Sequence, residues 1–261
     1  MTKYNSSRYR VEPLVDAIKS NDDNLNKMLA TVESSFLIPA FNSLEQAPVY
    51  YYGENEKPLK PSKEHLIKLV EYFASKKFDH EISGEERRDL LGYNGEDKRL
   101  EAKTRALAKI ENVYGRENLP IAWYIFEGSS YPDLFIEGKD VIIICEGKWT
   151  EPYITTETTH LKTQRGEYRN QMVRHIQGAL NYSQKKVIAF YIVDEDCGYL
   201  TELEKAAFDE QLSKETITLS AEETCKISSA FYGYTTWQRL SKAIPELKFL
   251  SKEEIDQIAK K

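Results

Sequence analysis

The segment PDLFIEGKDVIIICEGK, residues 132–148, is the most informative part of this 261-residue chain for both its fold and its candidate chemistry. It holds two β-prone segments, residues 134–136 and 141–145, joined by a short segment that contains a glycine. Two apolar runs on either side of a turn signal predict a β-hairpin. The second run is β-branched and unbroken, which is typical of a strand covered on both faces.

Three ionisable residues lie at one end of the predicted hairpin. Asp133 opens its first strand, while Glu146 and Lys148 end the second, two residues apart and therefore on one face. Pairing of the strands brings Asp133 beside Glu146. Converging carboxylates suit Mg²⁺, with Mn²⁺ as a substitute, and the carbonyl of Gly147 can add an oxygen. Lys148 can then orient a water molecule or neutralise a phosphate.

The Glu-x-Lys pattern has little value without this context, because it also occurs at other positions of the chain. Glu101-Ala-Lys103 falls within a predicted helix, and Glu137-Gly-Lys139 falls in the expected hairpin turn. Neither follows an apolar strand. Only the pair at Glu146 follows such a strand and has a Pro-Asp at the start of the partner strand, so we expect the site there.

The segments around the hairpin predict an alternation of helices and strands. Apolar residues recur at helical spacing over 98–114, and residues 121–126 are β-prone. A helix over 165–183 and a buried strand over 187–193 follow the hairpin. The expected order is helix, three strands, helix, strand. Residues 50–52 fit either a strand or an extended loop.

The two ends of the chain are expected to be mainly helical. Ser62 can cap a helix over 63–76, and Ser251 with Glu254 fits a capping box. The aromatic segment 231–237 could stack on nucleic-acid bases, although such clusters are more often core. We expect three regions, 1–95, 96–195 and 196–261, which can also form one integrated domain.

Residues 98–193 resemble the PD-(D/E)XK nuclease superfamily, whose members have the restriction-endonuclease-like fold. The expected fold is α/β, with an α-β-β-β-α-β core and a mixed sheet. The resemblance rests on Pro132-Asp133, Glu146 and Lys148 in the strand context described above. It implies that Asp133 and Glu146 are metal ligands and that Lys148 is the catalytic lysine.

Two further positions follow from this resemblance. Many members carry a glutamate on the helix before the hairpin, for which Glu101 is preferred over Glu111. The alternative for Glu101 is an ordinary surface pair with Arg105. Related nucleases carry Gln-x-x-x-Tyr on the helix after the motif. Here Gln171 is followed four residues later by His175, so the pattern is broken, but Gln171 can still reach the site.

The charge of the chain is unevenly distributed. The net charge is −6, yet residues 160–186 hold six cations and a single anion, Glu167. Clustered cations next to the motif favour a nucleic-acid partner despite the overall charge. Arg169 and Arg174 are the expected phosphate contacts. Solvated helix charges are the alternative for both.

The sequence therefore predicts a Mg²⁺-dependent endonuclease that hydrolyses DNA, most similar to restriction or other microbial defence nucleases. Cutting both strands implies a homodimer. The rivals are a repair, recombination or RNA-directed nuclease with the same site, and a nucleic-acid-binding protein with a decayed site. Three scattered cysteines, no signal-like segment and no long apolar run predict a cytoplasmic protein without a membrane span.

Overall fold

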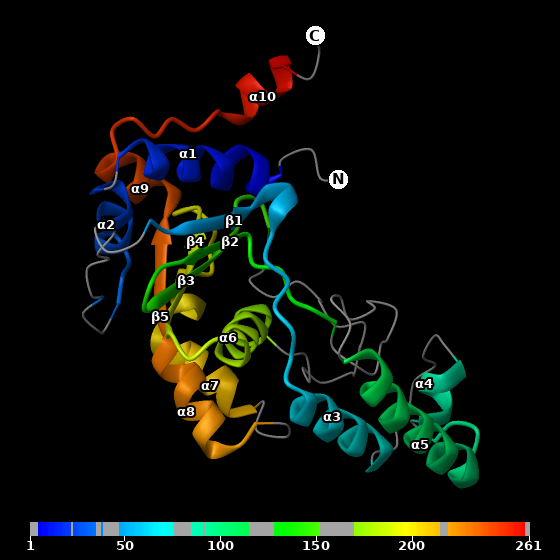
Figure 1. Ribbon diagram of the computed structural model, residues 1–261. Coiled ribbons are helices and arrows are strands. Elements are labelled where there is room, and N and C mark those ends of the chain that lie inside the picture. The colour runs from blue at the N-terminus through cyan, green and yellow to red at the C-terminus, as the bar shows by residue number, and fades with distance from the viewer. Residues whose placement is uncertain are drawn as a thin grey trace.

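The centre of the computed structural model is a mixed β-sheet with helices on both faces (Figure 1). The structure describes residues 5–21, 23–34, 38, 47–75, 85–90, 92–114, 128–151, 170–214 and 219–258. Within these ranges the sheet has five strands: β1 (Val49–Tyr52), β2 (Leu134–Glu137), β3 (Val141–Gly147), β4 (Lys186–Val193) and β5 (Phe231–Thr236). The coarse α/β class expected from the sequence is confirmed.

The strands lie across the sheet in chain order. β1 pairs with β2 and β2 with β3 in antiparallel fashion, while β3, β4 and β5 run parallel. In the β2–β3 hairpin Leu134 stands opposite Cys145, so Asp133 and Glu146 come next to each other at the same end. The hairpin expected over residues 134–145 is thus present, and its register brings the two carboxylates together.

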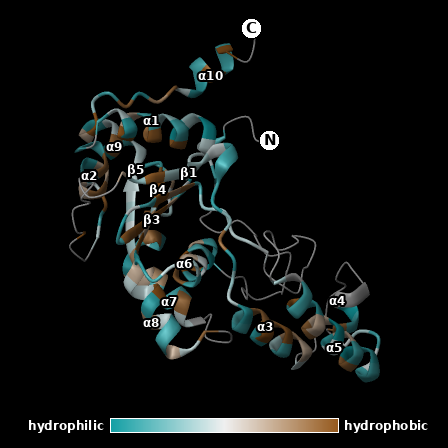
Figure 2. Ribbon diagram, viewed as in Figure 1, coloured by the Kyte–Doolittle hydropathy of each residue, from teal (hydrophilic) through white to brown (hydrophobic). Residues whose placement is uncertain are grey.

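Helices cover the two faces of the sheet as separate layers. One face packs against α6 (Gln171–Tyr182), η3 (Leu200–Leu203), α7 (Lys205–Lys214) and α8 (Ala221–Ala230). The other packs against η1 (Ser7–Val11), α1 (Glu12–Ser20), α2 (Asp23–Ala30) and α9 (Trp237–Ala243). Hydrophobic residues are concentrated in the central strands (brown in Figure 2), and their side chains pack against those of the helices. Each fully buried aliphatic side chain contributes roughly 1.5–3 kcal/mol.

A helical arm, α3–α5, is inserted between β1 and β2. It consists of α3 (Lys63–Ser75), α4 (Glu85–Leu90) and α5 (Glu96–Val113), reached through the turn η2 (Gly53–Asn55). The arm has an apolar core of its own, made by residues such as Leu66, Val70 and Ile110. It projects away from the sheet (Figure 1). The Ser62 cap is confirmed, since the Ser62 hydroxyl accepts the His65 N–H at 3.1 Å.

The arm corrects the expected role of the helix over residues 98–114. That helix exists as α5, but it packs on α3 and α4 rather than on the sheet. The sheet packs instead against α1, which precedes the first strand. Residues 50–52, for which the sequence left strand and loop open, form the edge strand β1. The strand expected over 121–126 lies outside the described residues. The ranges 1–95, 96–195 and 196–261 all contribute strands to the sheet.

The C-terminal part also differs from the expected helices. Phe231–Thr236 forms the fifth strand, β5, and its side chains are buried, so the aromatic segment belongs to the core. The last helix, α10 (Lys252–Ile258), has the expected capping box between Ser251 and Glu254. No helix among the described residues is both long and apolar enough to cross a bilayer.

We predict that Gly178→Ala destabilises the protein by about 1–3 kcal/mol. An added Cβ at this position of α6 would lie 2.7 Å from Cβ of Leu59 and 3.3 Å from its carbonyl carbon, so the helix or residue 59 would have to shift. Intrinsic helix propensity alone predicts the opposite sign, a gain of about 1 kcal/mol. Urea denaturation decides between them, and a stabilised variant would contradict the close packing of residue 59 on α6.

Candidate active site

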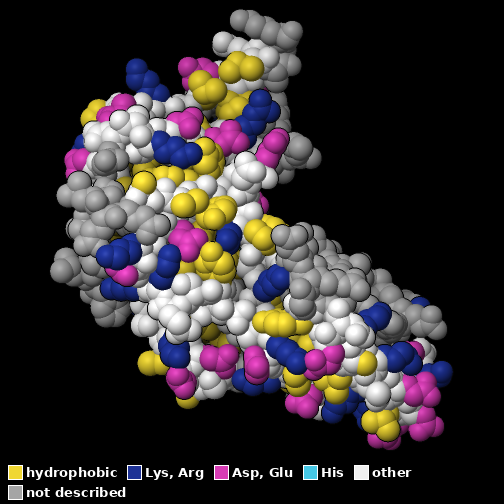
Figure 3. Space-filling view, in the orientation of Figure 1, with side chains coloured by type: hydrophobic (Ala, Val, Ile, Leu, Met, Phe, Trp, Pro, Cys, Tyr) yellow, Lys and Arg dark blue, Asp and Glu magenta, His cyan; other side chains and the backbone are white. Residues whose placement is uncertain are grey.

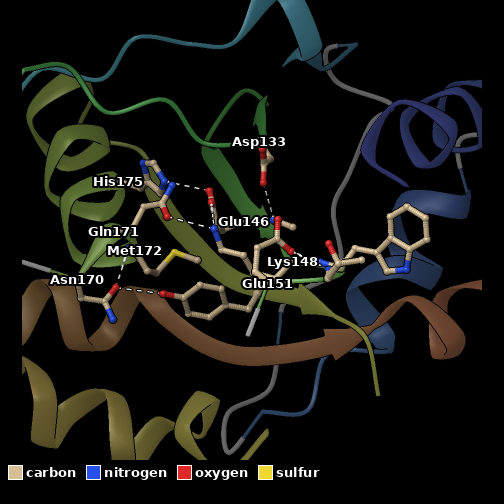
Figure 4. Close-up of polar contacts among 12 residues, drawn as sticks. Asp133, Glu146, Lys148, Glu151, Asn170, Gln171, Met172 and His175 are labelled. Atoms are coloured by element: carbon tan, nitrogen blue, oxygen red, sulfur yellow. Dashed lines mark hydrogen bonds and ion pairs between the residues drawn. The ribbon is translucent and has the colours of Figure 1, made fainter. Parts of the chain in front are cut away.

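Asp133, Glu146 and Lys148 meet at one end of the sheet, on the face that α6 covers (Figure 4). Side chains alternate along β3: Ile142 and Ile144 face α6, and Glu146 and Lys148 continue that side. The Gly147 N–H donates to Oδ2 of Asp133 at 2.8 Å, which ties the start of β2 to the end of β3. The three residues singled out by the motif are therefore brought together.

Glu146 and Lys148 form a buried ion pair. Nζ of Lys148 lies 2.8 Å from Oε1 of Glu146, and only 5% and 2% of the two residues are exposed. The main chain of Lys148 is held on both sides, since its N–H donates to the Ile192 carbonyl and its carbonyl accepts from the Trp237 indole. The ammonium is thus placed by the backbone rather than by a mobile surface chain.

Helix α6 contributes two side chains, one turn apart, to this pair. Its first turn is capped by Asn170, whose Oδ1 accepts the Met172 N–H at 2.7 Å. Oε1 of Gln171 accepts from Lys148 at 3.3 Å, and Nε2 of His175 lies 3.1 Å from Oε2 of Glu146. The structure thus places Gln171 in contact with Lys148. His175, noted in the sequence only because it broke a pattern, is a site residue that the motif did not reveal.

The pKa values of the two carboxylates are shifted in opposite directions. Burial alone would raise the pKa of Glu146, but the Lys148 ammonium and the His175 hydrogen bond outweigh it and lower the pKa to about 2. Burial and the charge of Glu146 raise the pKa of Asp133 well above its usual range. Glu146 is therefore ionised at neutral pH, whereas Asp133 resists ionisation unless a further positive charge arrives.

The two bases of the site follow the same logic. Burial lowers the pKa of Lys148, yet the charge of Glu146 and their hydrogen bond reverse this and raise it, so Lys148 stays a cation. Burial lowers the pKa of His175, and its bond to Glu146 only partly opposes that effect. His175 is thus neutral at pH 7, and Lys148 is the cation that faces the two carboxylates.

A third carboxylate, that of Glu56, adds negative charge near the site. Burial, followed by the charge of Glu146, raises the pKa of Glu56 to about 7, and Glu56 in turn raises the pKa of Asp133. Glu56 follows β1, and because Tyr52 pairs with Leu134, the chain leaves β1 at the same end as Asp133. Glu56 belongs to no motif that the sequence analysis identified. Recognition of residues 50–52 as a strand beside β2 would have pointed to it.

Glu101 and Glu111 do not belong to this site. Both lie on α5 in the arm, and more than half of each side chain is exposed. Glu101 pairs with Lys98 at 3.6 Å and with Arg105 at 3.7 Å, and Glu111 pairs with Lys63. The preference for Glu101 as an assisting glutamate was wrong, and its alternative as a surface pair with Arg105 describes the contacts. The physical reason is that α5 packs in the arm instead of on the sheet.

The cations of the basic segment, residues 160–186, do not form one continuous surface in the part that the structure describes. Arg174 is 9% exposed and donates to the Gly128 carbonyl at 3.2 Å, so it is not a solvated helix charge. Lys185 pairs with Glu137 at the opposite end of β2 from Asp133. Arg169 lies outside the described residues. On the face drawn in Figure 3, basic side chains are interspersed with acidic ones.

A cation would complete the charge balance of this site. Among the described residues no three or more His, Cys, Asp or Glu side chains form a ready metal-binding group. Mg²⁺, however, is commonly bound by one or two carboxylates together with waters and substrate phosphates. Asp133 and Glu146 supply such a pair, and the raised pKa of Asp133 marks a place where added positive charge is favourable. The donor set therefore fits a hard divalent cation.

We predict that Glu56→Gln stabilises the metal-free protein at pH 8 and leaves it unchanged at pH 4. The folded-state pKa of Glu56 is about 7, above its ordinary value of 4.5. Stability linked to this group is present below pH 4.5 and is lost as the pH rises toward 7. Urea denaturation in EDTA at both pH values measures the difference. Equal stability of the two proteins at pH 8 would contradict the placement of Glu56 beside Glu146.

Comparisons with known proteins identify no relative of this chain. No protein-family model, no curated protein and no solved structure matches the chain. What the site does is therefore inferred from its own residues.

Proposed function

We propose that this protein is a metal-dependent nuclease that hydrolyses phosphodiester bonds of DNA. The observation that carries the proposal is the meeting of Asp133, Glu146 and Lys148 at one end of the β2–β3 hairpin. Two carboxylates and a buried ammonium form a site that can bind both a divalent cation and a phosphate. The proposed cation is Mg²⁺, for which Mn²⁺ can substitute.

In this proposal Asp133 and Glu146 hold the cation, and the Gly147 carbonyl can add an oxygen. When bound, the cation supplies Lewis acidity to a phosphoryl oxygen and lowers the pKa of a water molecule. The protein contributes the placement of the ligands. Asp133 is oriented by the Gly147 N–H at 2.8 Å, and the backbone places Glu146 through the pairing of β3 with β2 and β4.

Lys148 is the proposed contact to the scissile phosphate. An ammonium has three donors, of which one meets Glu146 and another meets Gln171. Among the described residues these are its two hydrogen-bond partners, and its third donor can meet a phosphate oxygen or a nucleophilic water. Because the ammonium is held in a buried, preorganised position, its charge can stabilise the charge that develops on the phosphate without reorganisation.

The order of elements on the sheet supports a restriction-endonuclease-like core. Apart from α2, which follows α1 on the same face, the elements in chain order are α1, β1, β2, β3, α6 and β4. Pairing is antiparallel up to β3 and parallel between β3 and β4. This is the helix, three strands, helix, strand order that the resemblance implies, with the arm inserted after β1 and with β5 added. A restriction or other microbial defence nuclease, acting on DNA as a homodimer, is the specific form proposed.

Lys148→Gln tests the proposed role of the lysine. We expect cleavage of plasmid DNA to fall on the order of a hundredfold or more, because the charge beside the phosphate is lost. Both Lys148→Gln and Lys148→Ala remove the cation that faces Glu146. Glutamine keeps a hydrogen-bond donor for the carboxylate, so it should cost less stability than the about 3–5 kcal/mol expected for alanine. Lys139→Gln, in the other Glu-Gly-Lys of the hairpin, is the matched control and should cleave normally. A folded Lys148→Gln protein with wild-type cleavage would reject the role.

Asp133→Asn tests whether Asp133 is needed for metal-dependent cleavage without being needed for folding. Cleavage in Mg²⁺ should be lost, since a hard anionic ligand is replaced by a neutral amide. Stability in EDTA at pH 8 should be equal or higher, because the repulsion from Glu146 is removed and the amide oxygen can still accept the Gly147 N–H. Glu101→Ala, on the arm, serves as the unaffected control.

The assay also separates the substrate classes. Plasmid DNA, single-stranded DNA and RNA are incubated with wild-type protein in Mg²⁺, in Mn²⁺ and in EDTA. If the protein cleaves RNA and neither form of DNA, the proposed substrate is RNA instead of DNA. DNA binding without cleavage of any substrate in either metal would instead indicate a nucleic-acid-binding protein with an inactive site, and the nuclease proposal would fail.

A further inference from the structure

His175 is a buried side chain that none of the proposed chemistry uses. Its ring is fully buried on α6, and its Nε2 lies 3.1 Å from Oε2 of Glu146 (Figure 4). Glu146 pairs with the Lys148 ammonium through its other oxygen, so it is a carboxylate and can only accept. Nε2 of His175 must therefore carry the proton and donate it. Nδ1 is then a bare acceptor, and among the described residues it has no hydrogen-bond partner.

Glu146 is consequently held at both oxygens, by donors from two different elements. Oε1 meets Lys148 from the same strand, and Oε2 meets His175 from α6. A carboxylate held by the ammonium alone could rotate and bind it with both oxygens. The second donor, which comes from α6, opposes this rotation. Among the described residues, Lys148 then uses one donor on Glu146 and another on Gln171, so that a third can meet the substrate.

We propose that His175 is a positioning residue for Glu146: its Nε2–H fixes Oε2, so that Oε1 meets Lys148 in one orientation. This inference rests on the nuclease function proposed above, in which Glu146 is a metal ligand. Residues that hold a metal ligand from behind influence both metal affinity and rate, because they orient the ligand before the metal binds. The two contacts of α6, through Gln171 and His175, thereby set the geometry of the whole Glu-x-Lys pair.

The rival role for His175 is simple filling of the core. Its neighbours Met172 and Ile176 belong to the apolar cluster between α6 and the sheet, so any residue of similar volume could serve that purpose. The two roles differ in one respect. A positioning residue needs an N–H donor at the place of Nε2, whereas a core residue needs only volume.

The experiment compares His175→Leu, which keeps volume without a donor, with His175→Gln, whose side-chain amide can donate to Glu146. For the folded fraction of each variant, Mg²⁺ affinity is measured by calorimetric titration, and kcat and KM for DNA cleavage are measured separately. His65→Leu, at a fully buried histidine in the arm, controls for the loss of a buried imidazole.

We expect His175→Leu to lower kcat by about tenfold or more and to weaken Mg²⁺ binding, with KM for DNA nearly unchanged, as loss of a hydrogen bond to a charged group implies. His175→Gln should recover most of both quantities, and His65→Leu should change neither. Equal Mg²⁺ affinity and kcat in wild type and His175→Leu, or equal losses in the Leu and Gln variants, would overturn the positioning role.

The same data distinguish this inference from the nuclease proposal. Wild-type protein that binds Mg²⁺ but cleaves no nucleic acid would reject the nuclease alone, and the Mg²⁺ affinities of the Leu and Gln variants would still decide the role of His175. Wild-type protein that does not bind Mg²⁺ would overturn both.

Discussion

The burial of one carboxylate, that of Glu146, constrains the rest of the site. Removing an ion from water costs several kcal/mol unless partners replace the solvent. Here the partners are Lys148 at 2.8 Å and His175 at 3.1 Å, and they come from β3 and α6. The position of α6 on the sheet and the orientation of Glu146 are therefore linked. Displacement of the helix would leave the carboxylate with one partner.

The second carboxylate, Asp133, shows the opposite balance. It receives a backbone N–H from Gly147, yet burial and the charges of Glu146 and Glu56 raise its pKa. Without a further cation the site therefore favours a protonated Asp133. In the proposed metal site, a divalent ion would relieve this repulsion between the carboxylates.

The candidate site could be predicted because its main residues are close in sequence. Asp133, Glu146 and Lys148 lie within one hairpin, whose apolar runs and turn determine the register. The parts that were missed depend on contacts between distant segments. β1 pairs with β2 across about eighty residues that include the arm, so β1 carried only an ambiguous local signal and Glu56 carried none. Glu101 was chosen from a helix that periodicity predicts correctly but cannot assign to a partner.

The arm also explains why the expected order of helices and strands is present but is formed by other segments than those expected. A helix directly before the hairpin was expected to pack on the sheet, but α5 buries its apolar residues against α3 and α4. The helix and strand that complete the sheet, α1 and β1, precede the arm. An amphipathic pattern predicts that a helix buries one face, and it leaves open which surface covers that face.

The central claim is that Asp133 and Glu146 form a divalent-cation site whose repulsion the cation relieves. The most direct measurement is the melting temperature at pH 8 in EDTA and in millimolar Mg²⁺, for wild type and Asp133→Asn. The account predicts that Mg²⁺ raises the melting temperature of the wild type and has little effect on the variant, since a ligand that binds only the folded state stabilises it. A wild-type melting temperature that Mg²⁺ does not change, or an equal rise in both proteins, would contradict the claim.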